Sequence, residues 1–279
     1  ALIRDDLERR VLGTSKSALR SNIMETSKQI SHSIARTLGR NIGKQLFARV
    51  HEEFGGKLRL LVSGGSALGC HLYDDFKALG LTIYEGYGLT ETAPVLTVNP
   101  WNLSRRGSAG KAVPGVEISI FRPDKNGVGE IVARTPSLMK EYFRNERATK
   151  EVLREGWFHT GDLGWVDEDG YIYITGRIKD VIVTGAGKNV YPCDLEAIYQ
   201  RIPEISEICV FGIRNGLTED VHAIVRPNAN LLGELPPSEA KKRIQREIQK
   251  LGRELPSYQR FQHVHLRTEP FPRKDDGTI

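Results

Sequence analysis

The stretch YEGYGLTET, residues 84–92, gathers aromatic rings, glycines, hydroxyl groups and carboxylates in a short segment. Glycines flank Tyr87 on both sides, which favours an open turn where its ring can lie against a flat ligand. Thr90 can donate to a phosphate oxygen, and Glu91 offers the hard oxygen that Mg²⁺ takes besides substrate phosphates. The combination indicates a nucleotide site; a loop whose tyrosine packs in the core is the simpler alternative.

Four further stretches carry groups suited to the same ligand. SGGSALG, residues 63–69, has paired glycines that let the backbone approach a flat or anionic group, although a tight turn is the commoner role. Asp162 in HTGDLG can accept hydrogen bonds from two ribose hydroxyls, or close a local turn. Arg177 in GRIKD can reach sugar or phosphate oxygens, or lie in solvent at a domain edge. TGAGKNVYP offers a flexible glycine turn at Gly185 beside Lys188.

The composition is that of a globular protein with a mild positive charge. The chain has 279 residues, 39% hydrophobic and 27% charged, with a net charge of +5. Its basic residues are spread along the sequence, whereas a nucleic-acid binder usually concentrates them. We therefore expect no nucleic-acid partner; an anionic ligand, or weak peripheral contact with an anionic membrane surface, explains the charge equally well.

The cysteines and the apolar runs point to the cytoplasm. Cys70, Cys193 and Cys209 have no metal or redox spacing, and an odd count argues against a disulfide framework. No apolar run reaches the length of a membrane span, and no signal peptide opens the chain. Because the chain begins at Ala1, we expect it to be an excerpt of a longer protein.

The elements that must position these residues fall into an α/β class. After polar, helical residues 1–54, strand, glycine turn, helix and strand alternate over residues 57–88, which predicts an α/β layer with parallel pairing. The helix CHLYDDFKALG ends at Gly80. From about Gly107, VEISIF, GEIVAR and YIYITGR alternate as strands of an antiparallel, barrel-like region.

Helix signals complete the pattern. In NERATKEVLREG, Asn145 is the expected N-cap and Gly156 the stop. Pro192 suits the first position of a later helix, and Ser238 is the expected cap of another. Two helices against a small sheet after Arg177 predict a small α+β domain, so we place domains at 1–178 and 179–279.

The motifs SGGSALG, EGYGLTET, TGD, GRIKDVIVTGAGKNVYPCDLE and LPSYQRFQHVHL, in this order, resemble the adenylate-forming (AMP-binding) enzymes. Within that superfamily they are most similar to long-chain fatty acyl-CoA synthetases. The resemblance implies the carboxyl-terminal part of a large adenylate-forming domain followed by a small mobile domain. It also implies a ligase that joins a fatty acid to ATP-Mg²⁺, forming an acyl-adenylate, and then to CoA.

The resemblance places one group of residues around the base and phosphates of ATP. Thr90 contacts the α-phosphate and Glu91 the magnesium. The residues around adenine are Gly65, Ser66, Ala67, Glu85, Gly86, Tyr87 and Gly88.

The resemblance places the remaining residues at the sugar and in the small domain. Asp162 and Arg177 hold the ribose. Lys179 matches the hinge about which the small domain turns between the two half-reactions. Gly185 and Lys188 belong to a loop that moves towards the CoA thiol tunnel.

The chain departs from the family in two ways. No Ser/Thr/Gly-rich phosphate loop precedes Lys57, so we expect the carboxyl-terminal half of a synthetase, inactive by itself. In PRKDDGTI, Thr278 stands where the family has a lysine, with Lys274 out of register. An uncharged threonine cannot supply the electrostatic contribution of that lysine.

Several alternatives stay open. The acyl group can pass to a carrier protein or stop at the adenylate, and Thr278 motivates a catalytically impaired nucleotide-binding regulator. A peptide-synthetase adenylation domain ranks lower, because GRIKDVIVTGAGKNVYP differs from its hinge pattern. No GxxxxGK[ST] or GxGxxG motif supports a P-loop NTPase or a Rossmann dehydrogenase. The sequence is compatible with a homo-oligomer and does not fix the acyl chain length.

Overall fold

A computed structural model describes residues 28, 31, 42–66, 68–233 and 235–272. Most of the amino-terminal region expected to be helical therefore lies outside the described residues. The chain divides into two compact units. The first comprises residues up to 117 together with 134–142 and 167–173, and the second comprises 118–133, 143–166 and the chain from 174 onwards.

The first unit contains the expected parallel pair of strands. In the sheet β1-β2-β3-β4, β1 and β2 run parallel with Leu61 opposite Ile83, and β3 and β4 add to them antiparallel. Its elements are α3 (Gly43–Leu46), α4 (Ala48–Glu53), β1 (Leu61–Ser63), α5 (Cys70–Ala78), β2 (Ile83–Gly88), the 3₁₀ turn η1 (Thr90–Thr92), β3 (Val95–Val98) and β4 (Lys111–Ala112).

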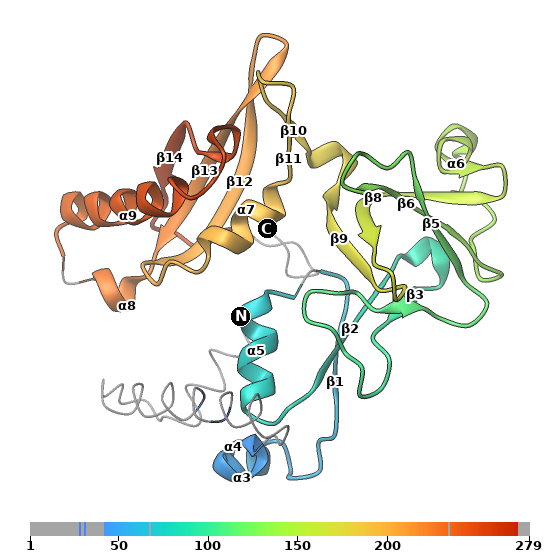
Figure 1. Cartoon of the computed structure of the whole chain (residues 1–279), viewed down its shortest axis with the longest axis horizontal. Coiled ribbons are helices and arrows are strands. Elements are labelled where there is room, and N and C mark those ends of the chain that lie inside the picture. The colour runs from blue at the N-terminus through green and yellow to red at the C-terminus, as the bar shows by residue number, and fades with distance from the viewer. Residues whose placement is uncertain (1–27, 29–30, 32–41, 67, 234, 273–279) are drawn as a thin grey trace. The chain divides into compact units, whose positions relative to one another are not determined.

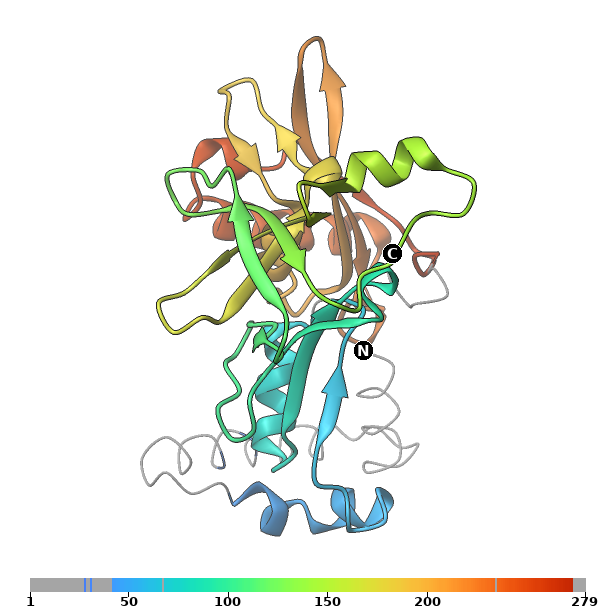
Figure 2. The same cartoon turned by 90° about the vertical axis from the view of Figure 1, so that its right-hand side faces the viewer.

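Helix α5 lies alongside β2 in both views (Figures 1 and 2). Its buried Phe76 packs in one cluster with Val50 of α4 and Ile83 of β2. The helix ends as predicted before Gly80, whose φ of +80° is the left-handed conformation that glycine adopts without strain. These contacts fix the start of β2, from which the YEGYG segment continues.

The second unit opens with a curled sheet of order β5-β6-β8-β7, with β9 also pairing with β8 (Figure 1). This matches the predicted antiparallel, barrel-like region. HTGDLG, for which a local turn closed by Asp162 was one interpretation, lies inside β8. The elements are β5 (Glu117–Phe121), β6 (Gly129–Arg134), α6 (Glu146–Val152), β7 (Leu153–Arg154), β8 (Trp157–Val166), β9 (Ile172–Arg177) and the 3₁₀ turn η2 (Ile178–Asp180).

Two helix-end predictions need correction and two are confirmed. The Asn145 side chain accepts a hydrogen bond from the Ala148 amide at 3.1 Å, so it caps α6 as expected. However, α6 ends at Val152, and Gly156 instead turns the chain between β7 and β8 at φ +78°. Helix α7 begins at Pro192, as predicted. Helix α9 begins at Pro237 and has no side-chain cap, so Ser238 is not the cap but lies inside the first turn.

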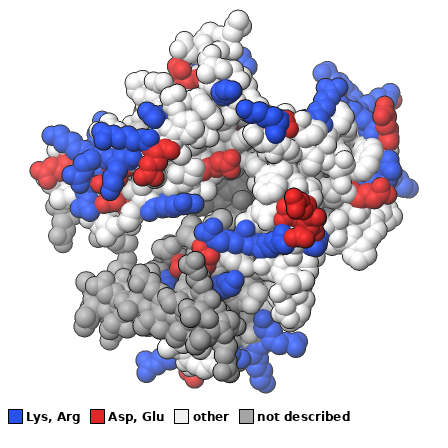
Figure 3. Space-filling view, in the orientation of Figure 1, with Lys and Arg blue, Asp and Glu red and all other residues white. Residues whose placement is uncertain are grey.

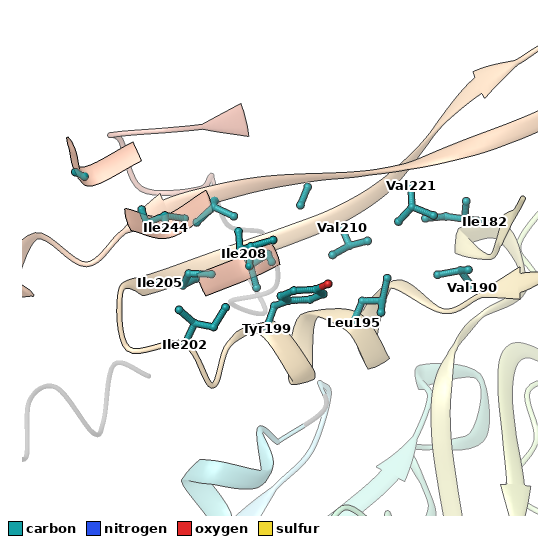
Figure 4. Packing of buried hydrophobic residues seen from close by; sticks show 14 of the residues in the cluster. Ile182, Val190, Leu195, Tyr199, Ile202, Ile205, Ile208, Val210, Val221 and Ile244 are labelled. Atoms are coloured by element: carbon teal, nitrogen blue, oxygen red, sulfur yellow. The ribbon is translucent and has the colours of Figure 1, made fainter. Parts of the chain in front are cut away.

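The last part of the second unit is a three-stranded sheet packed against helices. Strands β12 and β13 are antiparallel, and β14 lies parallel to β13. Figure 4 shows Leu195 and Tyr199 of α7 directed at Val210 of β12, with Ile244 of α9 in the same cluster. The elements are β10 (Ile182–Val183), β11 (Asn189–Val190), α7 (Pro192–Tyr199), β12 (Ile205–Asn215), β13 (Thr218–Pro227), α8 (Ala229–Leu232), α9 (Pro237–Gly252), η3 (Ser257–Gln259) and β14 (His263–Leu266).

The α/β fold class is thus confirmed, with a carboxyl-terminal α+β part. The predicted boundary between residues 178 and 179 falls inside η2, between β9 and β10, and it stays a prediction. Within the described residues, no helix combines the length and the apolar character that crossing a membrane requires.

Charge is distributed over the face shown in Figure 3. Lys and Arg side chains alternate there with Asp and Glu, and a denser positive group lies over α9, which exposes Lys241, Lys242 and Lys250. The expectation that the protein has no nucleic-acid partner stays a prediction.

Candidate functional site

The glycine turn after β1 runs against β2. Gly65 has φ +85°, and a Cβ there would meet no atom of the described residues within 4 Å, so it is the backbone conformation that favours glycine. A Cβ on Gly64 would lie 3.4 Å from the carbonyl oxygen of Gly86. Ser66 is exposed, and Ala67 lies outside the described residues. The turn therefore offers backbone groups and one hydroxyl, that of Ser66, beside the YEGYG segment of β2.

Glu85 is a buried carboxylate in β2. Only 9% of the residue is exposed, and its backbone pairs with Ser63 of β1. The Leu68 amide donates to the carboxylate, but Oε1 has no hydrogen-bond partner among the described residues. Burial disfavours the charged form and raises the pKa of Glu85 to about 7. Near neutral pH this carboxyl can therefore both donate and accept a hydrogen bond.

Tyr87 lies in β2 and not on the open turn that we expected. The strand continues to Gly88, and Tyr87 pairs with Thr97 of β3. A Cβ on Gly88 would lie 1.7 Å from the carbonyl oxygen of Pro94, and one on Gly86 would lie 3.0 Å from that of Thr97. Both glycines thus allow close approach of backbone, while the half-buried Tyr87 ring is not enclosed in the core.

The TET segment forms η1 directly after β2. Thr90 is exposed, whereas Thr92 is fully buried and its hydroxyl lies 2.9 Å from the carbonyl oxygen of Leu89 and 3.0 Å from that of Pro94. Thr92 therefore fixes the turn. The two predicted site residues of η1 differ. Thr90 is free to meet a ligand, whereas Glu91 is held by contacts with the protein.

Tyr142 holds the side chain of Glu91. Its hydroxyl donates to Glu91 Oε1 at 2.8 Å, and the Met139 amide donates to the Glu91 carbonyl oxygen at 2.7 Å. Burial and the neighbouring carboxylate raise the pKa of Tyr142 to about 12, so this hydroxyl stays a donor. Sequence reasoning missed Tyr142, because nothing in the segment MKEYF signals a contact with a residue so distant in the chain.

Asp162 and Arg177 lie together in the second unit. The buried Asp162 accepts a hydrogen bond at Oδ1 from Arg177 Nε at 2.8 Å. The Arg177 side chain is about half exposed, at 47%. Two residues predicted separately to hold a sugar thus form one charged pair, which can accept from and donate to neighbouring hydroxyl and phosphate groups.

The loop between β10 and β11 is exposed and organised by a threonine. The buried Thr184 donates from Oγ1 to the Lys188 carbonyl oxygen at 3.0 Å, and its own carbonyl accepts from the Gly187 amide. Gly185 and Lys188 are exposed, as is Lys179 of η2. The predicted lysine position at Thr278 lies outside the described residues.

The two units therefore hold two groups of candidate residues. In the first unit, Glu85, Tyr87 and Glu91 follow one another along β2 and η1. In the second unit, Asp162 and Arg177 are paired by a hydrogen bond. Among the described residues, no group of three or more His, Cys, Asp or Glu side chains is placed to hold a metal ion.

Comparison with known proteins shows similarity to one enzyme family over part of the chain. Residues 20–143 match the AMP-binding enzyme family. A long-chain-fatty-acid–CoA ligase, FadD15 of Mycobacterium bovis, is 44% identical over 167 residues, which are 60% of this chain and 27% of that protein. A chloroplastic long-chain-fatty-acid–[acyl-carrier-protein] ligase of Arabidopsis thaliana is 35% identical over 71% of this chain and 29% of its own length.

A solved structure shares the fold. O-succinylbenzoate coenzyme A synthetase of Bacillus subtilis, in complex with ATP and a magnesium ion, superposes with a TM-score of 0.66 at 25% identity. The superposition covers 91% of this chain and 53% of the synthetase. The chain thus spans between about a quarter and a half of the length of the proteins that it matches.

Proposed function

We propose that this chain, whose residues 20–143 match the AMP-binding enzyme family, is part of a ligase that activates a fatty acid with ATP and transfers it to CoA. The similarity to a long-chain-fatty-acid–CoA ligase supports the substrate class. The similarity to a synthetase complexed with ATP and magnesium supports the nucleotide and the metal.

The observation that carries the proposal is that one carboxylate, Glu85 on β2, is buried, and that another, Glu91 on η1, is anchored. Glu85 is buried with one oxygen unpartnered among the described residues, which suits the amine and ring nitrogens of adenine. Glu91 is anchored by Tyr142, and a carboxylate oxygen is a ligand that Mg²⁺ accepts. The residues present therefore fit both ATP and its metal.

The chain's own residues would bind and orient the nucleotide. Tyr87 stacks on the base, and the exposed Thr90 donates to the α-phosphate. Asp162 accepts from the ribose hydroxyls, while Arg177 keeps that carboxylate in place. Magnesium, when bound, neutralises part of the phosphate charge, and Glu91 is the residue that would hold it.

The reaction that follows has two displacements. The fatty-acid carboxylate attacks the α-phosphorus and pyrophosphate leaves, giving the acyl-adenylate. The CoA thiolate then attacks the acyl carbonyl and AMP leaves, giving the thioester. Positioning and charge neutralisation supply most of the catalysis of such a transfer.

We also propose that the residues after about 178 act as a mobile domain, with Lys179 at the hinge. The support is that η2 is a short exposed turn between β9 and β10. The exposed loop with Gly185 and Lys188 would then approach the thiol in the second step.

The test is exchange of labelled pyrophosphate into ATP by the full-length protein that contains this chain. We expect exchange that depends on an added fatty acid, measured over a panel of medium and long chain lengths. Absence of exchange with every acid, under conditions where ATP binds by calorimetry, would refute the activity and favour a regulatory nucleotide-binding protein.

A second acceptor is a carrier protein. The similarity to a chloroplastic acyl-carrier-protein ligase favours this alternative. Thioester yield with CoA should exceed the yield with a phosphopantetheine-loaded carrier protein at equal concentration. The reverse ratio would identify the carrier protein as the preferred acceptor and would leave the proposed adenylation step unchanged.

A further inference from the structure

The residues around Asp162 form a bulge in β8. In the antiparallel pairing of β6 with β8, Glu130 lies opposite Leu163 and Val132 lies opposite His159. A single residue of β6 therefore faces residues 160–162 of β8. Extra residues in one strand disrupt the ladder locally and redirect side chains, and such bulges are common beside active sites. The direction of the Asp162 side chain thus depends on what holds this bulge.

Glu130 binds the bulge with both carboxylate oxygens. Its Oε2 accepts from His159 Nδ1 at 2.7 Å, and its Oε1 accepts from the Gly161 amide at 3.1 Å. The two side chains are mostly covered, with 15% of Glu130 and 9% of His159 exposed. One carboxylate therefore replaces the ladder hydrogen bonds that the bulge interrupts.

Thr160 completes the support. Its hydroxyl donates to the Ile131 carbonyl oxygen at 2.7 Å and accepts from the Asp162 amide at 3.1 Å. Gly161 has φ +72°, a conformation that glycine tolerates. The backbone on both sides of Asp162's amide is consequently fixed to β6 by side chains and not by the regular sheet.

Removing Glu130 would leave the Gly161 amide without its partner at a partly buried position. Turning this unsatisfied N–H group towards water lowers the free energy of the chain. That movement rotates the peptide that adjoins Asp162. The Asp162 carboxylate would then lose its orientation even though Arg177 still pairs with it. The loss of orientation would therefore affect the candidate ribose contact and not the candidate adenine contacts of β2.

We propose that Glu130 is a positioning residue, which holds the β8 bulge so that Asp162 presents its carboxylate to the ribose hydroxyls. The inference rests on the proposed role of Asp162 in nucleotide binding. It adds a residue whose motif, GEIVAR, reads in the sequence as nothing more than a strand.

The experiment compares AMP with 2′,3′-dideoxy-AMP by calorimetry on the full-length protein. If Asp162 binds the ribose hydroxyls, wild type binds AMP more tightly by roughly 10- to 100-fold, the range for hydrogen bonds to a charged group. Glu130→Ala should remove most of that preference by weakening AMP binding, while dideoxy-AMP binding changes less than about twofold. Glu130→Gln, which keeps an acceptor for the Gly161 amide, should retain most of the preference.

Two controls separate positioning from general damage. Glu117→Ala removes an exposed carboxylate of β5, 65% exposed, and should leave both affinities unchanged. Asp162→Ala should abolish the preference, and adding Glu130→Ala to it should weaken AMP binding no further, because the two residues act through one contact.

Three results would overturn the inference. If Glu130→Ala lowered the affinities for AMP and dideoxy-AMP equally, the role of Glu130 would be a general structural one. Full retention of the preference in that variant would show that Asp162 does not depend on Glu130. A wild-type protein without the preference would instead remove the ribose role of Asp162, and with it the premise.

Discussion

At the scale of single residues, the carboxylates of the candidate site differ in how the protein treats them. Glu91 and Asp162 each accept a hydrogen bond from a side chain, at 2.8 Å from Tyr142 and from Arg177 respectively. Among the described residues, the carboxylate of Glu85 has the Leu68 amide as its hydrogen-bond donor, and Glu85 is nearly as buried as a core residue. Burial without a countercharge favours the neutral acid and raises the pKa of Glu85 to about 7.

Glu85 should make stability fall as the pH rises. Its pKa is about 7 in the folded protein and 4.5 ordinarily, so the folded state binds more protons between these values. Stability is therefore lost as the pH rises from about 4.5 to about 7, by up to roughly 3 kcal/mol. We expect Glu85→Gln to raise the melting temperature at pH 8 and to leave it unchanged at pH 5. A gain of equal size at both pH values would contradict the assigned ionisation.

Tyr142→Phe should weaken magnesium binding without weakening AMP binding. The substitution removes the hydroxyl that fixes Glu91 and keeps the ring. Loss of an outer hydrogen bond to a metal ligand typically costs 10- to 100-fold in metal affinity, so the magnesium concentration for half-maximal pyrophosphate exchange should rise about tenfold.

Tyr173→Phe provides the matched control for this prediction. It removes another half-buried tyrosine hydroxyl, which lies 3.4 Å from Asp167. Its magnesium requirement should equal that of wild type. An unchanged requirement in Tyr142→Phe would mean that Glu91 is oriented without it or does not hold the metal.

At the scale of elements, the site depends on how closely β2 approaches the chain that returns as β3. The register shifts between Tyr87 and Gly88, which lie opposite Thr97 and Val95, so β3 contributes one extra residue. That irregularity brings the backbone of Pro94 against Gly88. The same close approach sets where η1 begins, and hence where Thr90 and Glu91 lie.

Gly88→Ala should therefore destabilise the first unit by about 1–3 kcal/mol. The added Cβ would lie 1.7 Å from the Pro94 carbonyl oxygen and 3.0 Å from the Leu96 amide nitrogen, and backbone atoms cannot move aside cheaply. Urea unfolding measures the change. Gly185→Ala is the control: its Cβ would approach only Thr218, at 3.7 Å, so stability should be unchanged. Equal stability of both variants would show that β3 adjusts freely.

At the scale of the whole molecule, the two units have separate hydrophobic cores. One cluster joins α4, α5 and β2 around Val50 and Phe76. The other joins α7, α9 and the sheet β12-β13-β14 around Leu195, Val225 and Ile244. Because each cluster lies within one unit, a core substitution should act mainly on the unit that contains it.

Ile244→Ala tests that separation. The side chain is fully buried in α9, so truncation should destabilise the second unit by about 2–4 kcal/mol. Amide hydrogen exchange should accelerate in β12 and β13 and stay unchanged in β1 and β2. Ile213→Ala, at a position 43% exposed in β12, should have little effect. Acceleration in both units would indicate that they unfold together.

Lys188→Ala tests the proposed division between the two half-reactions. If this exposed residue meets CoA only in the second step, the KM for CoA should rise by up to about fivefold, as expected for an exposed charge contact. Pyrophosphate exchange should stay at the wild-type rate. Lys125→Ala, which removes an exposed charge from another turn, should change neither quantity. A parallel loss of exchange would place Lys188 in the first step.

The sequence by itself determined the α/β class, the parallel pair β1–β2, the end of α5, the start of α7, and the resemblance to the adenylate-forming enzymes. These features depend on local signals: apolar periodicity, glycine and proline at chain turns, and motifs contiguous in the chain. It also indicated Tyr87, Glu91, Asp162 and Arg177 as candidates, because their residue types suit a nucleotide.

Only the tertiary structure decided what supports those candidates. It made HTGDLG a bulged strand, placed Tyr142 on Glu91, and put Glu130 against Gly161. It also buried Glu85 and so raised the pKa of its carboxyl. Each of these depends on register and on partners far apart in the chain. Hydrogen bonding and desolvation are set by which atoms meet in space, and no local pattern encodes that meeting.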